Sequence, residues 1–134
     1  MKLSNVLKVW QEELFQLVRE HIQPVVSDVN IKFVPISLEN FTLVKELRGI
    51  EYVEQFKEHL LCGDFGYYAY VNGEAVAYGW AKHQGSKDYF FEIGPECVYL
   101  CRFFTHEKMR GHNIYPALIS ALMDKENNYK VFFY

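Results

Sequence analysis

The chain has 134 residues, of which 50% are hydrophobic and 17% aromatic, a composition that predicts one well-packed globular domain and excludes disorder. Its 14 basic and 17 acidic residues give a net charge of −3, so we expect no nucleic-acid partner. No stretch approaches the roughly twenty apolar residues of a membrane span and the N-terminus lacks a signal-peptide pattern, so we expect no membrane contact and a cytoplasmic location.

Residues 3–22 have the pattern of an amphipathic helix. The apolar stripe recurs at helical spacing, and charged residues of mixed sign lie mostly elsewhere. Pro24 closes the segment. We therefore predict an N-terminal helical extension over residues 1–29 that packs on the domain or on a partner.

The next segment predicts one strand and two helices. Residues 30–35 alternate as a short strand does. Phe41, Val44 and Leu47 then mark one face of a first helix. Gly49 interrupts it, and a second helix is predicted over residues 52–61, ended by Gly63.

A hairpin is predicted at Asn72-Gly73, which lies between the β-rich runs 67–71 and 74–82. A two-residue turn of this type needs positive φ at both positions, and Asn-Gly supplies it. A polar loop over 84–88 and a strand fragment over 89–93 are expected to follow.

The apolar run 97–104 is typical of a buried strand, and the spacing of Ile114, Leu118 and Leu122 predicts a helix after it. Asn113 is a candidate N-cap, and Pro116 is compatible with a first helical turn. Residues 130–134 predict a last strand. This order of elements predicts an α+β sheet, mostly antiparallel, with a parallel pair at its end.

Three cysteines, Cys62, Cys97 and Cys101, lie in apolar surroundings, and we expect reduced core thiols. Cys97 and Cys101 are too far apart along a strand, roughly 13 Å, to share one ion. His59 and Cys62 could share a helix face, but no second pair matches them. We therefore predict no metal.

A short basic turn with one glycine joins the buried strand to the late helix. The first turn of a helix leaves about four N–H groups unpaired and carries roughly half a positive charge, so a phosphate can sit there. Gly111 lets the backbone approach a ligand, and Asn113 tolerates left-handed conformations better than most residues. Spacing alone leaves open a phosphate site or an ordinary strand–turn–helix connection.

The residues of this turn resemble motif A of the GNAT superfamily of N-acetyltransferases. The family pattern is Gln/Arg-x-x-Gly-x-Gly/Ala, and Arg110 takes its first position, whereas Asn113 and Tyr115 replace the two small residues. The chain matches the form Thr-x-x-x-x-Arg-Gly-x-x-Ile-Tyr-Pro, from Thr105 to Pro116, residue for residue.

The resemblance implies an α+β fold with a GNAT-like, mixed, mostly antiparallel central sheet flanked by helices, over residues 30–134. It also implies acetyl-CoA or another acyl-CoA as co-substrate, with pyrophosphate on the turn and pantetheine along the strand edge. The residues then expected to bind this co-substrate are Phe103, Phe104, Thr105, Arg110, Gly111, His112, Asn113, Ile114 and Tyr115.

Members of the family usually continue past the fifth strand with a helix, often carrying a tyrosine general acid, and a hairpin. We expect the 30–134 domain to lack both. The last strand would then present an apolar edge, which proteins normally cover. We expect the N-terminal helix or a second subunit of a homodimer to cover it.

The general base has four candidates near the strand or the loop before it: Glu92, Glu96, His83 and His106. No motif fixes any of them, and we select Glu92. Arg102 could pair with a buried acid or bind an anionic acceptor.

The leading hypothesis is an acyl-CoA-dependent N-acyltransferase, most simply an acetyltransferase, acting on a small-molecule or amino-sugar amine. A non-catalytic CoA-binding or protein-interaction domain derived from a truncated acetyltransferase is the alternative. A third interpretation is an α+β domain with no role for CoA.

Overall fold

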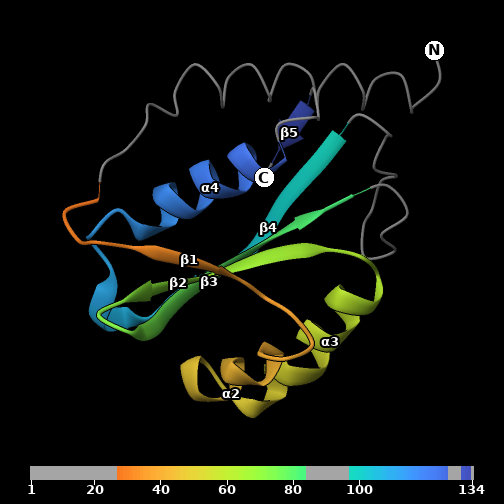
Figure 1. The fold of residues 1–134 in the computed structure, drawn as a ribbon, viewed down its shortest axis with the longest axis horizontal. Coiled ribbons are helices and arrows are strands. Elements are labelled where there is room, and N and C mark those ends of the chain that lie inside the picture. The colour runs from red at the N-terminus through yellow and green to blue at the C-terminus, as the bar shows by residue number, and fades with distance from the viewer. Residues whose placement is uncertain (1–26, 84–96, 127–130, 134) are drawn as a thin grey trace.

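A computed structural model describes residues 27–83, 97–126 and 131–133. The predicted N-terminal helix, the polar loop 84–88 and the strand fragment 89–93 lie outside these ranges. The described residues form a five-stranded sheet in the order β1-β2-β3-β4-β5 (Figure 1). Its strands are β1 (Lys32–Pro35), β2 (Phe65–Val71), β3 (Glu74–Lys82), β4 (Cys97–Thr105) and β5 (Val131–Phe133).

Strand directions confirm the predicted α+β topology. The first four strands pair antiparallel, and β5 pairs parallel with β4. The β2–β3 connection is the predicted Asn-Gly turn, with φ of 52° at Asn72 and 78° at Gly73. Positive φ at both positions matches the right-handed twist of the strands that the turn joins.

Helices cover both faces of the sheet (Figure 1). One face carries α2 (Val44–Leu47) and α3 (Val53–Leu61), each preceded by a short 3₁₀ turn, η1 (Phe41–Leu43) or η2 (Ile50–Tyr52). Gly49, with φ of 153°, separates the two helical segments as predicted. The other face carries α4 (Ile114–Lys125).

The core lies in two layers, one on each side of the sheet. Under α2 and α3 the layer is aromatic: the Phe56 ring meets Tyr78 and Trp80 edge-on, with ring centroids 4.7 and 5.1 Å apart. Under α4 the layer is mainly aliphatic, with Leu118 and Leu122 fully buried. Burial of each such side chain contributes about 1.5–3 kcal/mol, which holds the helices on the sheet.

Cysteine burial follows the prediction at two of three positions. Cys97 and Cys101 are buried on β4, whereas Cys62 is exposed, which corrects its prediction as a core thiol. Cys62 follows the last residue of α3, whose buried stripe runs through Phe56 and His59. Among the described helices, none combines the length and apolar character needed to span a bilayer.

A charged cluster is buried where α3 returns to the sheet. Asp64 Oδ2 lies 2.8 Å from His59 Nδ1 and 3.3 Å from Lys82 Nζ, and all three side chains are at most 2% exposed. The His59 ring stacks on Trp80 at a centroid distance of 4.3 Å. Buried charges are stable when they are paired, so Asp64 links the end of α3 to the end of β3.

Acid is expected to weaken this cluster. Burial lowers the pKa of His59, against the opposing hydrogen bond to Asp64, so the imidazole is neutral in the folded protein at pH 7. On acidification the unfolded chain takes up this proton first, from about pH 6.5. The contribution of neutral His59 to the free energy of unfolding is therefore complete above about pH 6.5. It is lost as the pH falls from there through the folded-state pKa, by at most about 1.4 kcal/mol per pH unit.

Urea unfolding of the wild type and of His59→Gln between pH 7.5 and 5.5 measures this effect. The wild type should lose stability more steeply than the variant. Parallel curves would contradict the role assigned to His59.

Candidate functional site

The connection from β4 to α4 has the backbone that the sequence predicts for an anion-binding turn. After η3 (Glu107–Met109), φ is 90° at Gly111 and 60° at Asn113. Asn113 occupies the N-cap position of α4, but its side chain makes no capping hydrogen bond, which corrects that expectation. A residue in the left-handed region does not have the extended backbone from which an N-cap side chain reaches the helix amides.

Main-chain amides along this turn are unused. At the start of α4 the amide of Ala117 donates to Asn113 O at 3.2 Å. Within the described part of the chain, the amides of Gly111, His112, Asn113 and Ile114 donate no hydrogen bond. Four successive free donors at the positive end of a helix favour a bound anion.

A pocket of about 200 Å³ is lined by three of these four residues, Gly111, Asn113 and Ile114. Gly111 and Asn113 are exposed there, so the corner is not buried. A Cβ added to Gly111 would meet no protein atom within 4 Å. The residues that line the pocket are Thr105, Met109, Arg110, Gly111, Asn113, Ile114, Tyr115 and Pro116.

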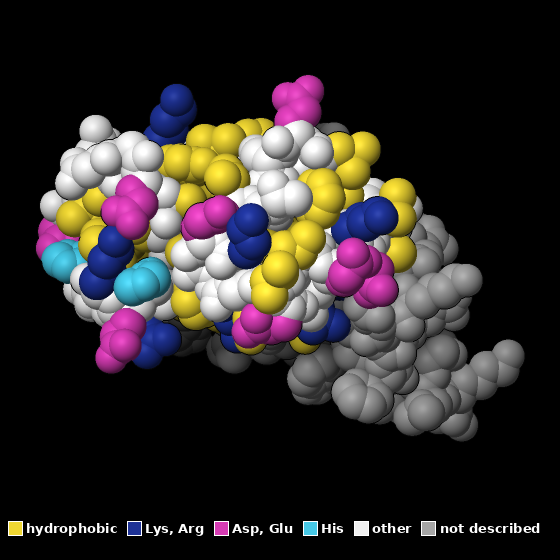
Figure 2. Space-filling model, turned by 90° about the horizontal axis from the view of Figure 1, so that it is seen from below, with side chains coloured by type: hydrophobic (Ala, Val, Ile, Leu, Met, Phe, Trp, Pro, Cys, Tyr) yellow, Lys and Arg dark blue, Asp and Glu magenta, His cyan; other side chains and the backbone are white. Residues whose placement is uncertain are grey.

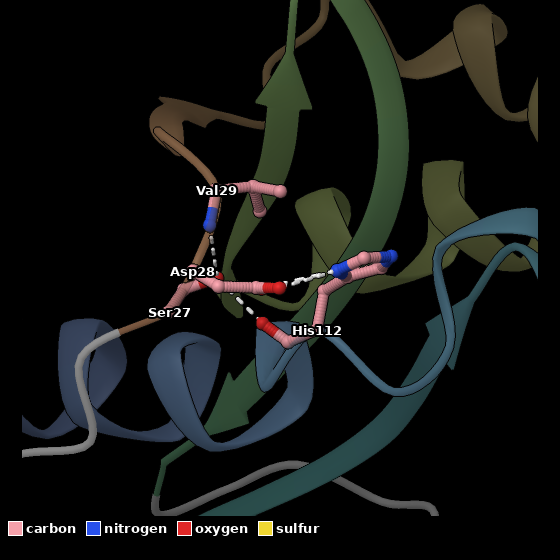
Figure 3. A network of polar contacts seen from close by, with 4 residues as sticks. All are labelled: Ser27, Asp28, Val29 and His112. Atoms are coloured by element: carbon pink, nitrogen blue, oxygen red, sulfur yellow. Dashed lines mark hydrogen bonds and ion pairs between the residues drawn. The ribbon is translucent and has the colours of Figure 1, made fainter.

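The turn is braced from both sides. Arg110 Nε donates to the carbonyl of Thr105 at 3.3 Å, which ties the turn to the end of β4. From the segment before β1, Asp28 accepts from the His112 ring at 3.0 Å, and Ser27 Oγ donates to the His112 carbonyl (Figure 3). The same Ser27 oxygen accepts from the Val29 amide at 3.3 Å. These contacts fix the path of the backbone that carries the free amides.

One edge of β4 leads to the pocket. β5 pairs with β4 only at Cys97–Tyr99, and no other described strand pairs with that edge from Leu100 to Thr105. The strand continues along this edge for about 17 Å, from Leu100 to Thr105. An extended molecule could therefore run along this edge and end in the pocket.

A β-bulge lies in the middle of the open edge. Trp80 pairs with Cys101 and Tyr78 with Phe104, so Gly79 faces two residues, Arg102 and Phe103. Arg102, exposed and with φ of 55°, is the extra residue. A bulge of this kind bends a strand, and the pairing of β4 with β5 ends at Tyr99, before the bulge.

The two phenylalanines of the predicted site lie on opposite faces of the sheet. The Phe103 ring meets the Tyr115 ring edge-on, at 4.9 Å between centroids, on the α4 face. The Phe104 ring stacks at 5.7 Å on Tyr78 on the α2–α3 face. Neither side chain lines the pocket. His112 also lies outside the lining, where it pairs with Asp28.

Gly79→Ala is expected to damage the site through the bulge. A Cβ at Gly79 would lie 2.4 Å from the Phe103 ring, so that ring must move and displace Tyr115 at the pocket wall. Overpacking of this kind costs about 1–3 kcal/mol. Thermal unfolding checks the cost, and Gly73→Ala, with open space around its Cβ position but φ of 78°, shows the loss from backbone strain without overpacking.

Candidate bases are only partly within the described residues. Glu92 and Glu96 lie outside them, and Glu92 stays a prediction. His83 Nε2 lies 3.0 Å from Glu126, and the hydrogen bond to this carboxylate raises the pKa of His83. A raised pKa disfavours the neutral form that a base needs. His106 Nδ1 accepts from the Lys108 amide and caps η3.

Metal ligation finds no support among the side chains that the structure describes. No group of three or more His, Cys, Asp or Glu residues converges there in a way that could hold an ion. The unused donors of the turn are N–H groups, which suit an anion instead.

The fold has clear counterparts among solved structures. The aminoglycoside N-acetyltransferase AAC(6')-Iy in complex with CoA aligns with a TM-score of 0.58 and 16% identity, over 83% of this chain and 78% of that one. The ribosomal-protein-alanine N-acetyltransferase of Brucella melitensis biovar Abortus 2308 gives 0.57 and 18%, over 78% and 77%. Arabidopsis thaliana NAA60 in complex with acetyl-CoA gives 0.54 and 20%, over 77% and 71%.

The chain has the GNAT fold. No protein-family model matches it, and no curated protein matches its sequence. The likeness therefore lies in architecture: the GNAT-like sheet predicted from the turn motif is confirmed, with α2 and α3 on one face and α4 on the other.

Some residues of the site were not among those predicted from the sequence. Met109 and Pro116 line the pocket and lie inside the motif, so their proximity to the turn was the available signal. Ser27 and Asp28 act on His112 across more than eighty residues of sequence, and no local pattern indicates that contact.

Proposed function

We propose that the protein binds acetyl-CoA or a related acyl-CoA and transfers the acyl group to an amine. The diphosphate would sit on the free amides of residues 111–114, and the pantetheine chain along the open edge of β4. The acetyl group moves from sulfur to nitrogen, while the amine loses a proton and the thiolate gains one. The acceptor is a small molecule with a primary amine.

One observation carries this proposal. Unused amides of Gly111, Asn113 and Ile114 lie at a pocket at the start of α4, and the edge of β4 beyond its pairing with β5 leads to the same pocket. The first feature can bind the diphosphate of a nucleotide, and the second can hydrogen-bond an amide-containing chain. The fold supports the proposal, because the similar AAC(6')-Iy and NAA60 structures contain CoA and acetyl-CoA.

The chain's own residues would contribute mainly by positioning. The amides of the turn bind and orient the diphosphate, and Arg110, exposed at the pocket rim, adds positive charge. Main-chain N–H groups of β4 near Phe103 to Thr105 would stabilise the oxyanion that forms on the thioester carbonyl. For the base we propose Glu92, which would remove the proton from the amine.

Titration calorimetry with acetyl-CoA and a thiol-release assay over a panel of amines test the proposal together. We expect micromolar or weaker binding and release of free CoA only with an accepted amine. Glu92→Gln should lower kcat and leave acetyl-CoA affinity unchanged. Binding without turnover over the whole panel would instead favour a non-catalytic CoA-binding domain, and absence of binding would reject both functions.

A further inference from the structure

Arg48 is held in one fixed position at the end of α2. Its guanidinium carbon lies 3.9 Å from the centre of the Tyr52 ring and 4.7 Å from that of Phe104. Nη1 donates to the hydroxyl of Tyr78 at 2.7 Å. Groups from η2, β3 and β4 therefore restrain the guanidinium, although the residue is exposed.

Most of the donors of Arg48 remain available. A guanidinium has five N–H groups, and contacts within the described residues use one of them. No described carboxylate lies within ion-pair distance, although Glu46 and Glu51 are close in sequence. An arginine whose orientation is fixed by aromatic rings and whose charge is unmatched is prepared to bind an oxyanion in a bidentate manner.

This arginine lies near the cofactor edge, on the opposite face of the sheet from α4. Phe104, which supports the guanidinium, precedes Thr105, a residue of the pocket wall. Arg48 thus lies beside the end of β4, on the face covered by α2 and α3. A second substrate that approaches the thioester from that face would pass Arg48.

The surroundings favour a small anion over a large one. Figure 2 looks onto the face that carries α2 and α3, where Lys and Arg side chains are scattered among hydrophobic and acidic ones. A polyanion would need a continuous positive surface. One oriented guanidinium instead fits a single carboxylate or phosphate group, and it repels a polycationic acceptor.

We propose that Arg48 binds an oxyanion of the acceptor, so that the substrate is a primary amine that also carries a carboxylate or a phosphate. The inference rests on the proposed acyl transfer and names its acceptor class. Arg48 is a substrate-binding residue in this scheme, and Tyr52, Tyr78 and Phe104 hold it in place.

Matched pairs of amines test the proposal. Phosphoethanolamine is compared with ethanolamine, and β-alanine with β-alaninamide, in the wild type, Arg48→Gln and Arg48→Lys. Lys45→Gln, which removes an exposed positive charge three residues away, is the control. We expect Arg48→Gln to lower kcat/KM about 10- to 100-fold for the anionic amines, mainly through KM, and to leave the neutral amines unchanged. Arg48→Lys should recover part of the loss, and Lys45→Gln should behave as wild type.

Equal losses for anionic and neutral amines would assign Arg48 a purely structural role and overturn the proposal. An NMR-monitored titration of the wild type and of Arg48→Gln with phosphoethanolamine tests anion binding directly and needs no acyl transfer. Binding lost in the variant supports the anion site even if acetyl-CoA does not bind and the acyl-transfer function fails. Equal binding, or none to either protein, rejects the site.

Discussion

Gly111→Val is expected to abolish acetyl-CoA binding while leaving the protein folded. The valine side chain would enter the pocket beside the free amides, where a Cβ meets no protein atom within 4 Å. It therefore competes with the ligand and not with the protein core. Loss of two hydrogen bonds to a charged group, at about 1.5 kcal/mol each, weakens binding about 100-fold. Calorimetry measures the change.

A second glycine provides the control for backbone strain. Gly63 also has positive φ, 80° against 90° for Gly111, and open space around its Cβ position. Gly63→Val should cost a similar amount of stability, about 1–2 kcal/mol, and bind acetyl-CoA as the wild type does. Arg110→Ala should weaken binding to a smaller extent than Gly111→Val, because main-chain donors provide most of the contact. Equal affinity in all of these proteins would contradict the assigned site.

Asp64→Ala is expected to cause the largest loss of stability. The substitution removes the carboxylate that lies against both His59 and Lys82 in a buried site. Breaking a buried ion pair costs about 3–5 kcal/mol, because a buried positive charge loses a close carboxylate. For a chain of this length the expected fall in Tm is about 10 °C or more.

Asp124→Ala is the matched control, since it removes an exposed aspartate near the end of α4. Its effect on stability should stay within about 0.5 kcal/mol. A similar Tm for the two variants would show that the buried carboxylate contributes little.

Local signals account for what the sequence predicted correctly. The hairpin depends on the two residues of its turn, and the helix α4 on the spacing of Ile114, Leu118 and Leu122. The cofactor turn is likewise a short stretch in which Gly111 supplies the required backbone. In each case the physical cause lies within a few residues, so the local sequence pattern predicts the structure without knowledge of the rest of the fold.

Features that depend on distant partners were not predicted. The register that places Gly79 opposite Arg102 arises from strand pairing. The guanidinium of Arg48 is held by two rings and one hydroxyl group, which come from three separate segments. The capping expectation at Asn113 was wrong because the backbone adopts the left-handed region there and so excludes the usual cap.

Arg102, the extra residue of the β4 bulge, shows how one insertion or deletion could change the pairing of this strand. Tyr99, Cys101 and Phe104 pack toward α2 and α3, whereas Val98, Leu100 and Phe103 pack toward α4. Excision of Arg102 would restore simple alternation and leave each of these side chains on its present side. One codon therefore separates a regular strand, which could pair along its whole length, from a bulged strand that leaves space for a ligand. In both forms the hydrophobic side chains of β4 stay on the same faces of the sheet.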